Sequence, residues 1–543
     1  MGDRNYSKSS VIIFHPGSRN LYFGRASDRH PHSILHVIAR RRTSSSSALS
    51  HKDTIVPISG KKLSEKIPEV ESARLQLSYT LQSALKSKGF TTNSIGSIAA
   101  YNKTAKSYPV QNSTPDACQN SIEDLEKRQF IIGNDVLKLP TNDTWNIHCP
   151  WRRGQLNLHR DIGGSITSVM TDLEEIWRWC LKEKLNISSK DIPQYRAVIV
   201  IPVCFDRLHA KHIMNLVIKR LGFQSAFLIQ DHVCGSFGCG RACATVVDVG
   251  DQKISVSCVE DGISYPQSRL ELKYGGGDLT VSLWNQLCLT SFPVPIQISE
   301  LWDLEFLNRL KENYCHLNLD ECGHPGDETI LWDKPGKQQE EYCVRFGDEL
   351  QIVPLSYFNP DLLRGSIGRK AVICHGPQPS VSDDPFDKGY LADTAKRGSK
   401  DAEDADEDDG EPQEGSQQNS KLSFEQPLGI DQAIVQSIDS CNVPEDLKRR
   451  LYSCIIVVGG GFKIKGLDSW LSYRMKIVTP KVVQPVESQE IIRAVKDGDP
   501  STVVWKGAAI LSSLETAKEL WINATEWRIQ GSKILREKSL FHF

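Results

Sequence analysis

Two carboxylates, Asp248 and Asp251, flank Gly250 in the segment TVVDVGDQKISVSCVEDG at residues 245–262. An apolar run precedes them and alternating side chains follow, which indicates two strands joined by a tight turn. Because glycine permits close backbone approach, such a turn can direct N–H groups at phosphate and its carboxylates at a bound metal ion. Asp and Gly are also common in the turns of ordinary hairpins. Taken alone, the segment favours the hairpin.

Two more glycine-rich turns follow apolar strands. The run at residues 11–14 leads into His15-Pro16-Gly17-Ser18, and the run at 455–458 leads into Gly459-Gly460-Gly461. The last turn does not match GxGxxG, since Ile464 stands where the third glycine belongs. A Rossmann domain shows one such turn. Three widely separated turns predict two related α/β lobes with phosphate held between them, an architecture that resembles actin, Hsp70 and the sugar kinases.

The elements that must position these turns are predicted from apolar spacing. We expect helices over residues 69–88, 171–185, 209–221 and 302–314, and central strands over 197–201 and 226–230. The polar stretch 102–120 is predicted to be a surface loop. Lys311 and Glu312, at the end of the last helix, are by base rate a solvated pair.

Composition narrows the class of protein. A chain of 543 residues exceeds one hydrophobic core and should form at least two lobes. Its net charge of −2 gives no indication of a general affinity for nucleic acid. The 15 cysteines are scattered, and the cluster at Cys234, Cys239 and Cys243 lacks a histidine at zinc-finger spacing. Without a signal peptide or a membrane-length apolar run, we expect a nuclear or cytoplasmic protein and no membrane partner.

Two segments interrupt the predicted fold. Residues 366–425 are rich in Asp, Glu, Gly, Ser and Gln, with an acidic run at 401–411. They cannot bury enough apolar surface to fold alone and are predicted to be a disordered insertion. The predicted division is an N-terminal tail at 1–10, the first part of the fold at 11–365 with an insertion in the small lobe at 43–126, the acidic insertion, and the last part of the fold at 426–543.

Several phrases carry a resemblance to the actin superfamily. The C-terminal stretch from VVWKGAAILSSLETAKELW to the end is similar to the actin C-terminus, and VVDVGDQ and RLELKYGGGDLT resemble actin's second phosphate loop and the segment after it. Within the superfamily, VIIFHPGSRNLYFGRASD, HVIARRR, WRRGQLN and VVGGGF look like the actin-related protein 8 family, whose plant relatives carry the number 9. The resemblance implies a two-lobed α/β actin-like fold with a central nucleotide cleft and two insertions.

The resemblance also implies a set of nucleotide-binding residues and ATP as their ligand. Gly17 and Ser18 match the first phosphate loop, and Asp248, Gly250 and Asp251 match the second, with Asp248 facing Mg²⁺ through water if the ion is bound. Gly276 matches the glycine beside the adenosine, and Gly459 and Gly460 match the double glycine near the α-phosphate. Lys311 and Glu312 match the pair around the base and ribose, which replaces the reading as a solvated pair.

Departures from the family pattern concentrate on the hydrolytic side. His15 replaces the first-loop aspartate, and Tyr22 replaces the phosphate-binding lysine. The water-orienting glutamine aligns with Asp231, one place after Gln230, and the histidine that assists it aligns with Ser255. Further along, Val249, Gln252 and Ser501 replace a serine, a glycine and the adenine-stacking lysine. Since positioning water is central to phosphoryl transfer, these changes predict a scaffold that either binds the nucleotide or is indifferent to it, with little or no ATPase activity.

The resemblance implies a nuclear subunit of an INO-eighty-type chromatin remodeller. Its implied partners are a long helix of the motor subunit, actin, another actin-related protein, and nucleosomal DNA or histones. The acidic run could attract histone tails, and Arg40–Arg42 and Arg152-Arg153 could touch DNA, although a solvated loop is the more common explanation of each. Two other functional classes stay open: an active ATPase of the actin fold and a filament subunit.

Overall fold

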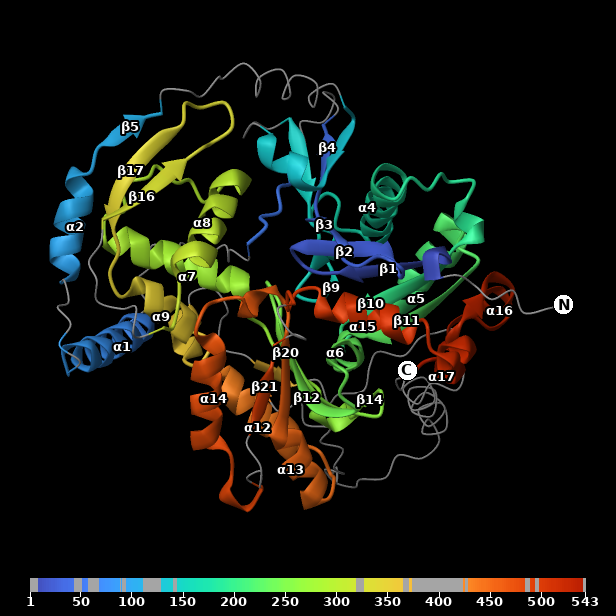
Figure 1. Cartoon of the computed structure of the whole chain (residues 1–543). Helices are drawn as coiled ribbons and strands as arrows, with labels where there is room; N and C mark the ends of the chain where they lie inside the picture. Colours follow the sequence, from blue (N-terminus) through green and yellow to red (C-terminus); the bar gives the residue numbers. More distant parts are fainter. Residues whose placement is uncertain are drawn as a thin grey trace, which may run out of the picture.

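The computed structural model describes the chain at residues 8–42, 51–56, 68–87, 89, 94–110, 128–139, 144–318, 327–364, 371–373, 423–424, 428–483, 489–493 and 498–540. Two β-sheets, each covered by helices, form two lobes (Figure 1). The first lobe holds both the start and the end of the described chain, and the second lobe holds most of the middle. The acidic run predicted at 401–411 lies outside the described residues.

The first lobe is built on a six-stranded sheet in the order β22-β11-β10-β1-β2-β3. Successive residues of its strands point to opposite faces. Ile12 and Phe14 pack with the helices on one face, while Val11 and Ile13 face the other lobe. Its strands are β1 (Val11–Pro16), β2 (Asn20–Arg25), β3 (His32–Leu35), β10 (Arg196–Ile201), β11 (Ser225–Gln230) and β22 (Ile522–Asn523).

Helices cover both faces of this sheet. Trp177 of α4 stacks on Phe14 with ring centroids 4.6 Å apart, which anchors the helix to β1. Gly222, with φ of 85°, ends the helical segment after α5, as predicted. The helices of this lobe are α4 (Ile166–Trp179), α5 (Arg207–Asn215), α15 (Val503–Leu511), α16 (Ala524–Gln530) and α17 (Ile534–Lys538), while α6 (Asp231–Cys239) packs on α15 between the two sheets.

The second lobe is built on an eight-stranded sheet in the order β19-β18-β15-β13-β12-β20-β21, with β14 paired to β13. The hairpin predicted at 245–262 is its centre: β12 pairs antiparallel with β13 and parallel with β20. Its strands are β12 (Cys243–Val249), β13 (Ile254–Glu260), β14 (Ile263–Ser264), β15 (Leu270–Leu272), β18 (Ala371–Ile373), β19 (Ser423–Phe424), β20 (Cys454–Val458) and β21 (Glu490–Ile492).

The remaining elements extend the two lobes outward. The helices of the second lobe are α7 (Gly276–Leu289), α8 (Leu301–Tyr314), α9 (Glu349–Leu355), α12 (Ile430–Asp439), α13 (Glu445–Ser453) and α14 (Leu467–Val478). The small sheets are β6-β4-β7, β16-β17-β5 and β8-β9, formed by β4 (Ile38–Arg41), β5 (Ser107–Pro109), β6 (Phe130–Ile132), β7 (Trp145–His148), β8 (Trp151–Arg152), β9 (Gln155–Leu156), β16 (Asp327–Trp332) and β17 (Glu340–Arg345).

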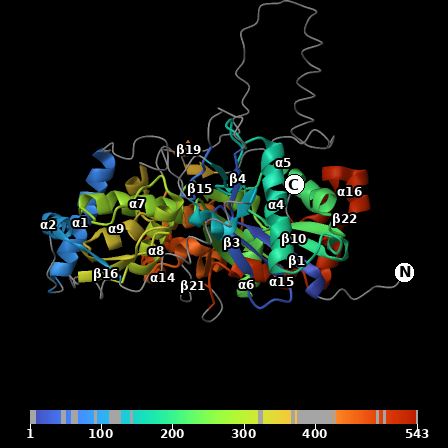
Figure 2. The ribbon, with the colours of Figure 1, turned by 90° about the horizontal axis from the view of Figure 1, so that it is seen from above.

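The described part of the insertion predicted at 43–126 crosses from one lobe to the other. It leaves the first lobe after β4, but its helices α1 (Pro68–Ser87) and α2 (Ile95–Thr104) pack on the second lobe, and β5 pairs with β17. Figure 2 shows α1 and α2 at the end of the molecule opposite α4 and α16. The sequence prediction had assigned this insertion to the small lobe alone.

The loop predicted at 102–120 is wrong at its start, because α2 continues to Thr104 and β5 follows it. Asn102 is buried there, where its amide nitrogen donates to the carbonyls of Thr290 and Arg345, at 3.0 Å each. In the part of the chain that the structure describes, no helix combines the length and apolar character needed to cross a membrane.

Candidate nucleotide-binding site

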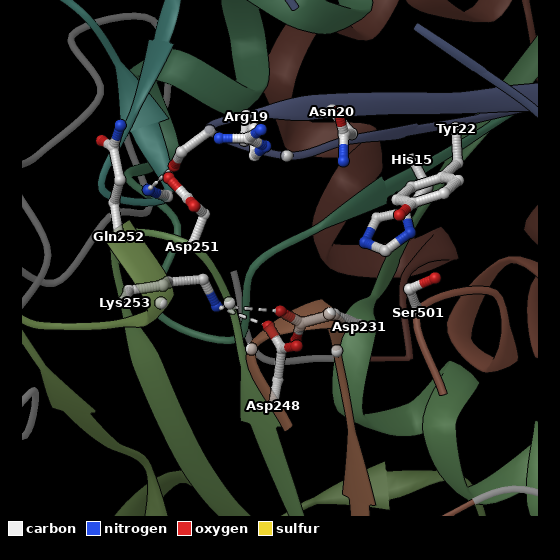
Figure 3. Close-up of a pocket in the computed structure, with 18 of the residues that line it drawn as sticks. His15, Arg19, Asn20, Tyr22, Asp231, Asp248, Asp251, Gln252, Lys253 and Ser501 are labelled. Carbon is white, nitrogen blue, oxygen red and sulfur yellow. Dashed lines mark hydrogen bonds and ion pairs between the residues drawn. The ribbon is translucent and has the colours of Figure 1, made fainter. Parts of the chain in front are cut away.

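The three glycine-rich turns meet at one cavity between the lobes (Figure 3). Each turn follows the carboxyl end of a strand: β1, β12 and β20. All of the predicted binding residues line this cavity, namely Gly17, Ser18, Asp248, Gly250, Asp251, Gly276, Lys311, Glu312, Gly459 and Gly460. The fold therefore brings together every residue that the sequence assigned to the site.

Glycine is required where the turns approach one another. Gly459 has φ of 95°, and a Cβ there would lie 2.4 Å from the carbonyl oxygen of Val249 and 2.7 Å from a carboxylate oxygen of Asp248. A side chain would therefore push β20 away from β12. The turn at Gly250 is closed by its own N–H, which donates to the carbonyl of Lys253 at 2.9 Å.

Lys311 secures the far side of the cavity. Its buried ammonium donates to the carbonyl oxygen of Gly276 at 2.6 Å, to the hydroxyl of Thr280 at 2.9 Å and to the amide oxygen of Asn308 at 2.8 Å. Burial lowers the pKa of Lys311. The neighbouring Glu312 is exposed and accepts a hydrogen bond from the Asn308 amide at 2.7 Å. Lys311 thus fixes the first turn of α7 while Glu312 stays open to a ligand.

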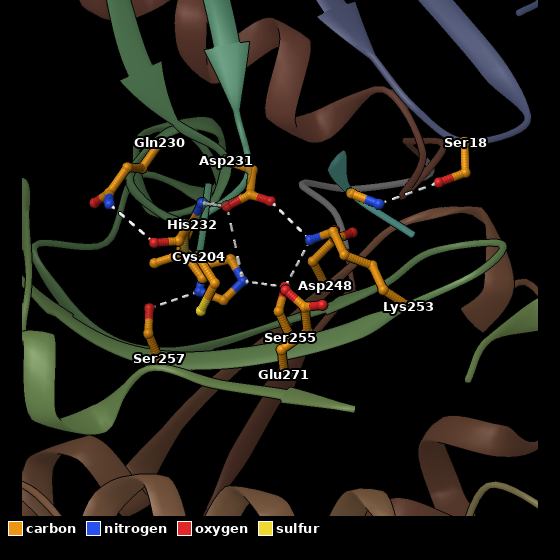
Figure 4. A network of polar contacts seen from close by, with 12 residues as sticks. Ser18, Cys204, Gln230, Asp231, His232, Asp248, Lys253, Ser255, Ser257 and Glu271 are labelled. Carbon is orange, nitrogen blue, oxygen red and sulfur yellow. Dashed lines mark hydrogen bonds and ion pairs between the residues drawn. The ribbon is translucent and has the colours of Figure 1, made fainter. Parts of the chain in front are cut away.

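Lys253 is the main residue of the site that the sequence analysis missed. Its ammonium lies between two carboxylates, 3.1 Å from Asp231 and 3.2 Å from Asp248, and 2.9 Å from the hydroxyl of Ser255 (Figure 4). Burial opposes the charge, but the two carboxylates outweigh it and raise the pKa of Lys253. Although burial disfavours ionisation of Asp231, the charge of Lys253 lowers its pKa.

The position of the Lys253 ammonium bears on whether the site can hold Mg²⁺ through Asp248. The family pattern places a hydrated ion beside that carboxylate, but here the Lys253 ammonium already contacts both Asp248 and Asp231 and offsets one of their two negative charges. The aspartate expected in the first loop is His15, which offers no carboxylate, and burial lowers its pKa. These residues do not fit an ion positioned in that way.

A second buried histidine compensates for a departure at Ser255. The ring of His232, at the start of α6, lies between two hydroxyls: Nδ1 is 2.5 Å from Ser257 and Nε2 is 3.0 Å from Ser255 (Figure 4). Burial lowers the pKa of His232, which favours the neutral ring. An imidazole therefore touches Ser255, where the family pattern has a histidine, but it enters from the neighbouring helix and is fully occupied.

The first loop contributes Arg19, which the sequence analysis also passed over. Arg19 forms an ion pair with Glu305 of α8, across the cleft from β1. Burial opposes its charge, but Glu305 raises the pKa of Arg19. Among the described residues, Nη1 of Arg19 and a carboxylate oxygen of Asp251 are buried without hydrogen-bond partners. Both atoms belong to residues that line the cavity, so a polar ligand could satisfy them.

Two of the arginines suggested as DNA contacts, Arg40 and Arg153, point elsewhere. Arg40 donates through Nε to the buried carboxylate of Asp172 at 2.7 Å. Arg153 donates to the backbone carbonyls of Gln252, at 3.0 Å, and Lys273. An arginine committed to internal acceptors is a poor ligand for an external phosphate, so the geometry of these two residues gives the DNA reading no support.

Comparison with known proteins identifies the fold that carries this cleft. A family model described as Actin matches residues 6–300 and 386–540. Actin-related protein 8 of Aedes aegypti is 40% identical to the chain, and the match covers 98% of this chain and 97% of that protein. The chain belongs to the actin family, in its actin-related protein 8 branch. The recognition made from the sequence phrases is confirmed.

Human relatives support the same placement within the actin family. Human actin-related protein 8 is 32% identical, over 98% of this chain and 92% of that protein. The solved structure of human actin-related protein Arp8 in its ATP-bound state matches with a TM-score of 0.80 at 30% identity, covering 99% of this chain and 98% of that one. The actin fold predicted from the sequence is therefore confirmed.

Proposed function

We propose that this actin-related chain binds ATP in the cleft and hydrolyses it slowly or not at all. The observation that carries the proposal is the position of Lys253 between Asp231 and Asp248. The glycine turns and Lys311 line one cavity, as the resemblance to actin implies, and this supports the proposal. The similarity to a human relative in an ATP-bound state supports ATP as the nucleotide.

The residues of the cavity match the chemistry of ATP. The triphosphate is anionic, and Lys253 and Arg19 bring two cations to the cavity, while the turns after β1 and β20 bring backbone close to it. Glu312, exposed at the rim, offers an acceptor of the kind that binds ribose hydroxyls. We infer that these groups hold the nucleotide and supply its specificity.

The same residues are poorly arranged for hydrolysis. Asp231 aligns with the family's water-orienting glutamine, but one of its oxygens accepts from Lys253 and the other from the backbone N–H of His232 at 2.8 Å. A carboxylate held in this way cannot rotate to orient an attacking water without breaking a buried ion pair. Slow or absent turnover follows.

We further propose that the chain acts in the nucleus as a non-catalytic subunit of an INO-eighty-type remodeller, beside actin and another actin-related protein on the motor subunit's helix. Membership of the actin-related protein 8 branch supports this role. Affinity purification of the tagged full-length chain from nuclear extract should recover those partners. Recovery of the chain alone, or with cytoskeletal proteins, would contradict the proposal.

We also propose that the chain contacts nucleosomes. The acidic segment at 401–411 offers a way to test this. Deleting residues 374–422 leaves β18 and β19, which pair antiparallel, to be joined by a short linker. If the acidic run at 401–411 attracts histone tails, this deletion weakens histone binding and the effect disappears at high salt. Unchanged histone affinity would assign the contact to another surface.

The alternative is an active ATPase or a cytoskeletal actin-related protein. Filament formation would require neighbouring chains to accommodate α1 and α2, which belong to a segment that the resemblance to actin marks as an insertion. Sedimentation of the purified chain with and without ATP distinguishes a filament-forming protein from one that stays monomeric. We expect the chain to remain in the supernatant under both conditions.

A further inference from the structure

A cluster of three histidines and an aspartate lies in the first lobe, outside the nucleotide cleft. His51 and Asp53 belong to the short segment after β4, which runs beside β7 through a bridge at Lys52 and Ile147. His148 ends β7, and His159 lies in the loop between β9 and α4. The proposed nucleotide function uses none of these residues.

The nitrogen and oxygen atoms of the cluster converge. Nε2 of His51 is 3.2 Å from Oδ1 of Asp53, and Nε2 of His148 is 3.8 Å from Oδ2 of the same carboxylate. Ligand atoms of His51, Asp53 and His159 all lie within 4.8 Å of one another. In a tetrahedral zinc site the ligand atoms are about 3.3–3.5 Å apart, so these three groups would have to move together by up to about 1.5 Å to share an ion.

Two of the rings have nitrogens that nothing else uses. Among the described residues, Nε2 of His148 and both ring nitrogens of His159 are buried without a hydrogen-bond partner. The His148 side chain is only 8% exposed. Burial, followed by repulsion from His51, lowers the pKa of His159, which keeps its ring neutral. Buried lone pairs that face a carboxylate are unfavourable unless a cation lies between them.

Surrounding groups orient the cluster as a second shell orients metal ligands. Nδ1 of His148 donates to the carboxylate of Asp172 at 2.7 Å, which leaves Nε2 with its lone pair facing the cluster. Oδ2 of Asp53 accepts from the N–H of Cys149 and the amide of Asn157, both at 2.9 Å. That leaves Oδ1, which Arg152 also approaches at 3.3 Å, as the oxygen available to an ion.

A glycine makes room for the His159 ring. A Cβ at Gly164 would lie 2.5 Å from Nδ1 of His159, and the preceding Gly163 has φ of 91°, a backbone conformation that favours glycine. The backbone N–H of His159 also donates to the carbonyl of Gly164 at 3.1 Å. The loop is thus shaped around His159 and holds its ring against the cluster.

We propose that His51, Asp53, His148 and His159 bind a structural zinc ion. Three imidazoles and one carboxylate are a donor set that zinc accepts in tetrahedral geometry. The ion would tie the segment that leaves β4 to the end of β7 and to the loop before α4. That segment leads into the part of the chain that crosses to the second lobe, so the site anchors the start of the crossing.

The test is zinc binding by the full-length purified protein. After dialysis against a chelator and titration with Zn²⁺ in competition with a chromogenic zinc indicator, we expect one zinc ion per chain. His148→Ala and His159→Gln should each weaken that binding by at least 100-fold. His212→Ala, which removes a half-buried histidine of α5 outside the cluster, should leave it unchanged. With Co²⁺, the wild type should show the visible absorption of a tetrahedral site, and the His148 variant should not.

A chelator experiment on the wild type keeps the test independent of variants that fold poorly. Removal of zinc should lower the Tm of the wild type and of His212→Ala, and re-addition should restore it, while the Tm of His159→Gln should not respond. If the wild type shows no saturable zinc binding and the same Tm with and without the ion, the cluster is only a buried polar network. Zinc binding that is equal in the wild type and the His148 and His159 variants would overturn the proposal as well.

Discussion

Among single residues, the ammonium of Lys253 best explains how this site differs from a cleft that hydrolyses ATP. Lys253 contacts Asp231, 22 positions before it, and Asp248, five positions before it. Hydrogen bonds to charged groups each contribute roughly 1.5–3 kcal/mol. Removing one partner of a buried ion pair costs about 3–5 kcal/mol, because the other charge stays buried. Lys253 therefore stabilises the two carboxylates and offsets part of the negative charge that they bring to the cavity.

The first prediction concerns Lys253→Met. The variant leaves two buried carboxylates facing the triphosphate, so ATP affinity should fall by at least tenfold, and the remaining binding should come to depend on Mg²⁺. The wild type should bind ATP with similar affinity in Mg²⁺ and in EDTA, as measured by calorimetry. Lys138→Met, which removes an exposed lysine paired with Asp135, is the control. Loss of wild-type binding in EDTA would contradict this role for Lys253.

The predicted and the missed residues differ in the kind of signal they leave in the sequence. Gly250 and Gly459 follow apolar strands, so local pattern and family resemblance found them, and the structure places both at the cavity. His232 and Lys253 act through partners on other elements, and no local spacing reveals that His232 contacts Ser255. A lysine beside an acidic glycine turn was the available signal, and its partner on α6 could not be foreseen.

At the scale of elements, apolar spacing predicted the helices well and polar composition misled once. The helix expected at 69–88 is α1, and the one expected at 302–314 is α8. The polar stretch after residue 102 was expected to be a loop, yet Asn102 is buried because its side chain satisfies backbone groups of the second lobe. The composition of a segment shows that its polar groups need hydrogen-bond partners. It does not show whether those partners are protein groups or water, which depends on the fold.

The second prediction concerns Glu349, at the start of α9. Burial raises the pKa of its carboxyl from 4.5 to about 7. The folded state therefore holds a proton that the unfolded state has lost, so the stability contributed by this group is present below pH 4.5 and is lost as pH rises to 7. Glu349→Gln removes that loss. We expect a gain of about 1–3 kcal/mol at pH 8.

The measurement is thermal unfolding of the wild type and Glu349→Gln at pH 5 and pH 8. The variant should raise Tm at pH 8 by several times as much as at pH 5. Glutamine retains an acceptor for the N–H of Gly347, which donates to this side chain at 2.9 Å. An equal shift at both pH values would show that the carboxyl is already ionised in the folded protein.

At the scale of the whole molecule, polar contacts hold the two lobes together around the cleft. Arg19, after β1, pairs with Glu305 of α8. Arg153, in the turn between β8 and β9, reaches the carbonyls of Gln252 and Lys273 in the second lobe. Opening the cleft to release a nucleotide would break these contacts, so they favour the closed arrangement.

The third prediction follows from this closure. Glu305→Gln removes the charge that pairs with Arg19, so the cleft should open more readily and a fluorescent ATP analogue should dissociate about fivefold faster or more in stopped flow. The control is Asp333→Asn. It removes the charge that pairs with Arg309 of the same helix, 3.0 Å away near the surface, and it should leave the dissociation rate unchanged. Equal dissociation rates for the wild type and Glu305→Gln would show that this ion pair does not hold the cleft closed.

The fate of bound ATP decides whether this cleft hydrolyses the nucleotide that it holds. The purified full-length chain is loaded with ATP labelled in the γ-phosphate, freed of excess nucleotide, and followed for several hours for release of phosphate. We predict that the nucleotide recovered from the protein is still ATP, and that Asp248→Ala changes the amount bound without altering the negligible release of phosphate. Steady phosphate release that Asp248→Ala abolishes would contradict the account.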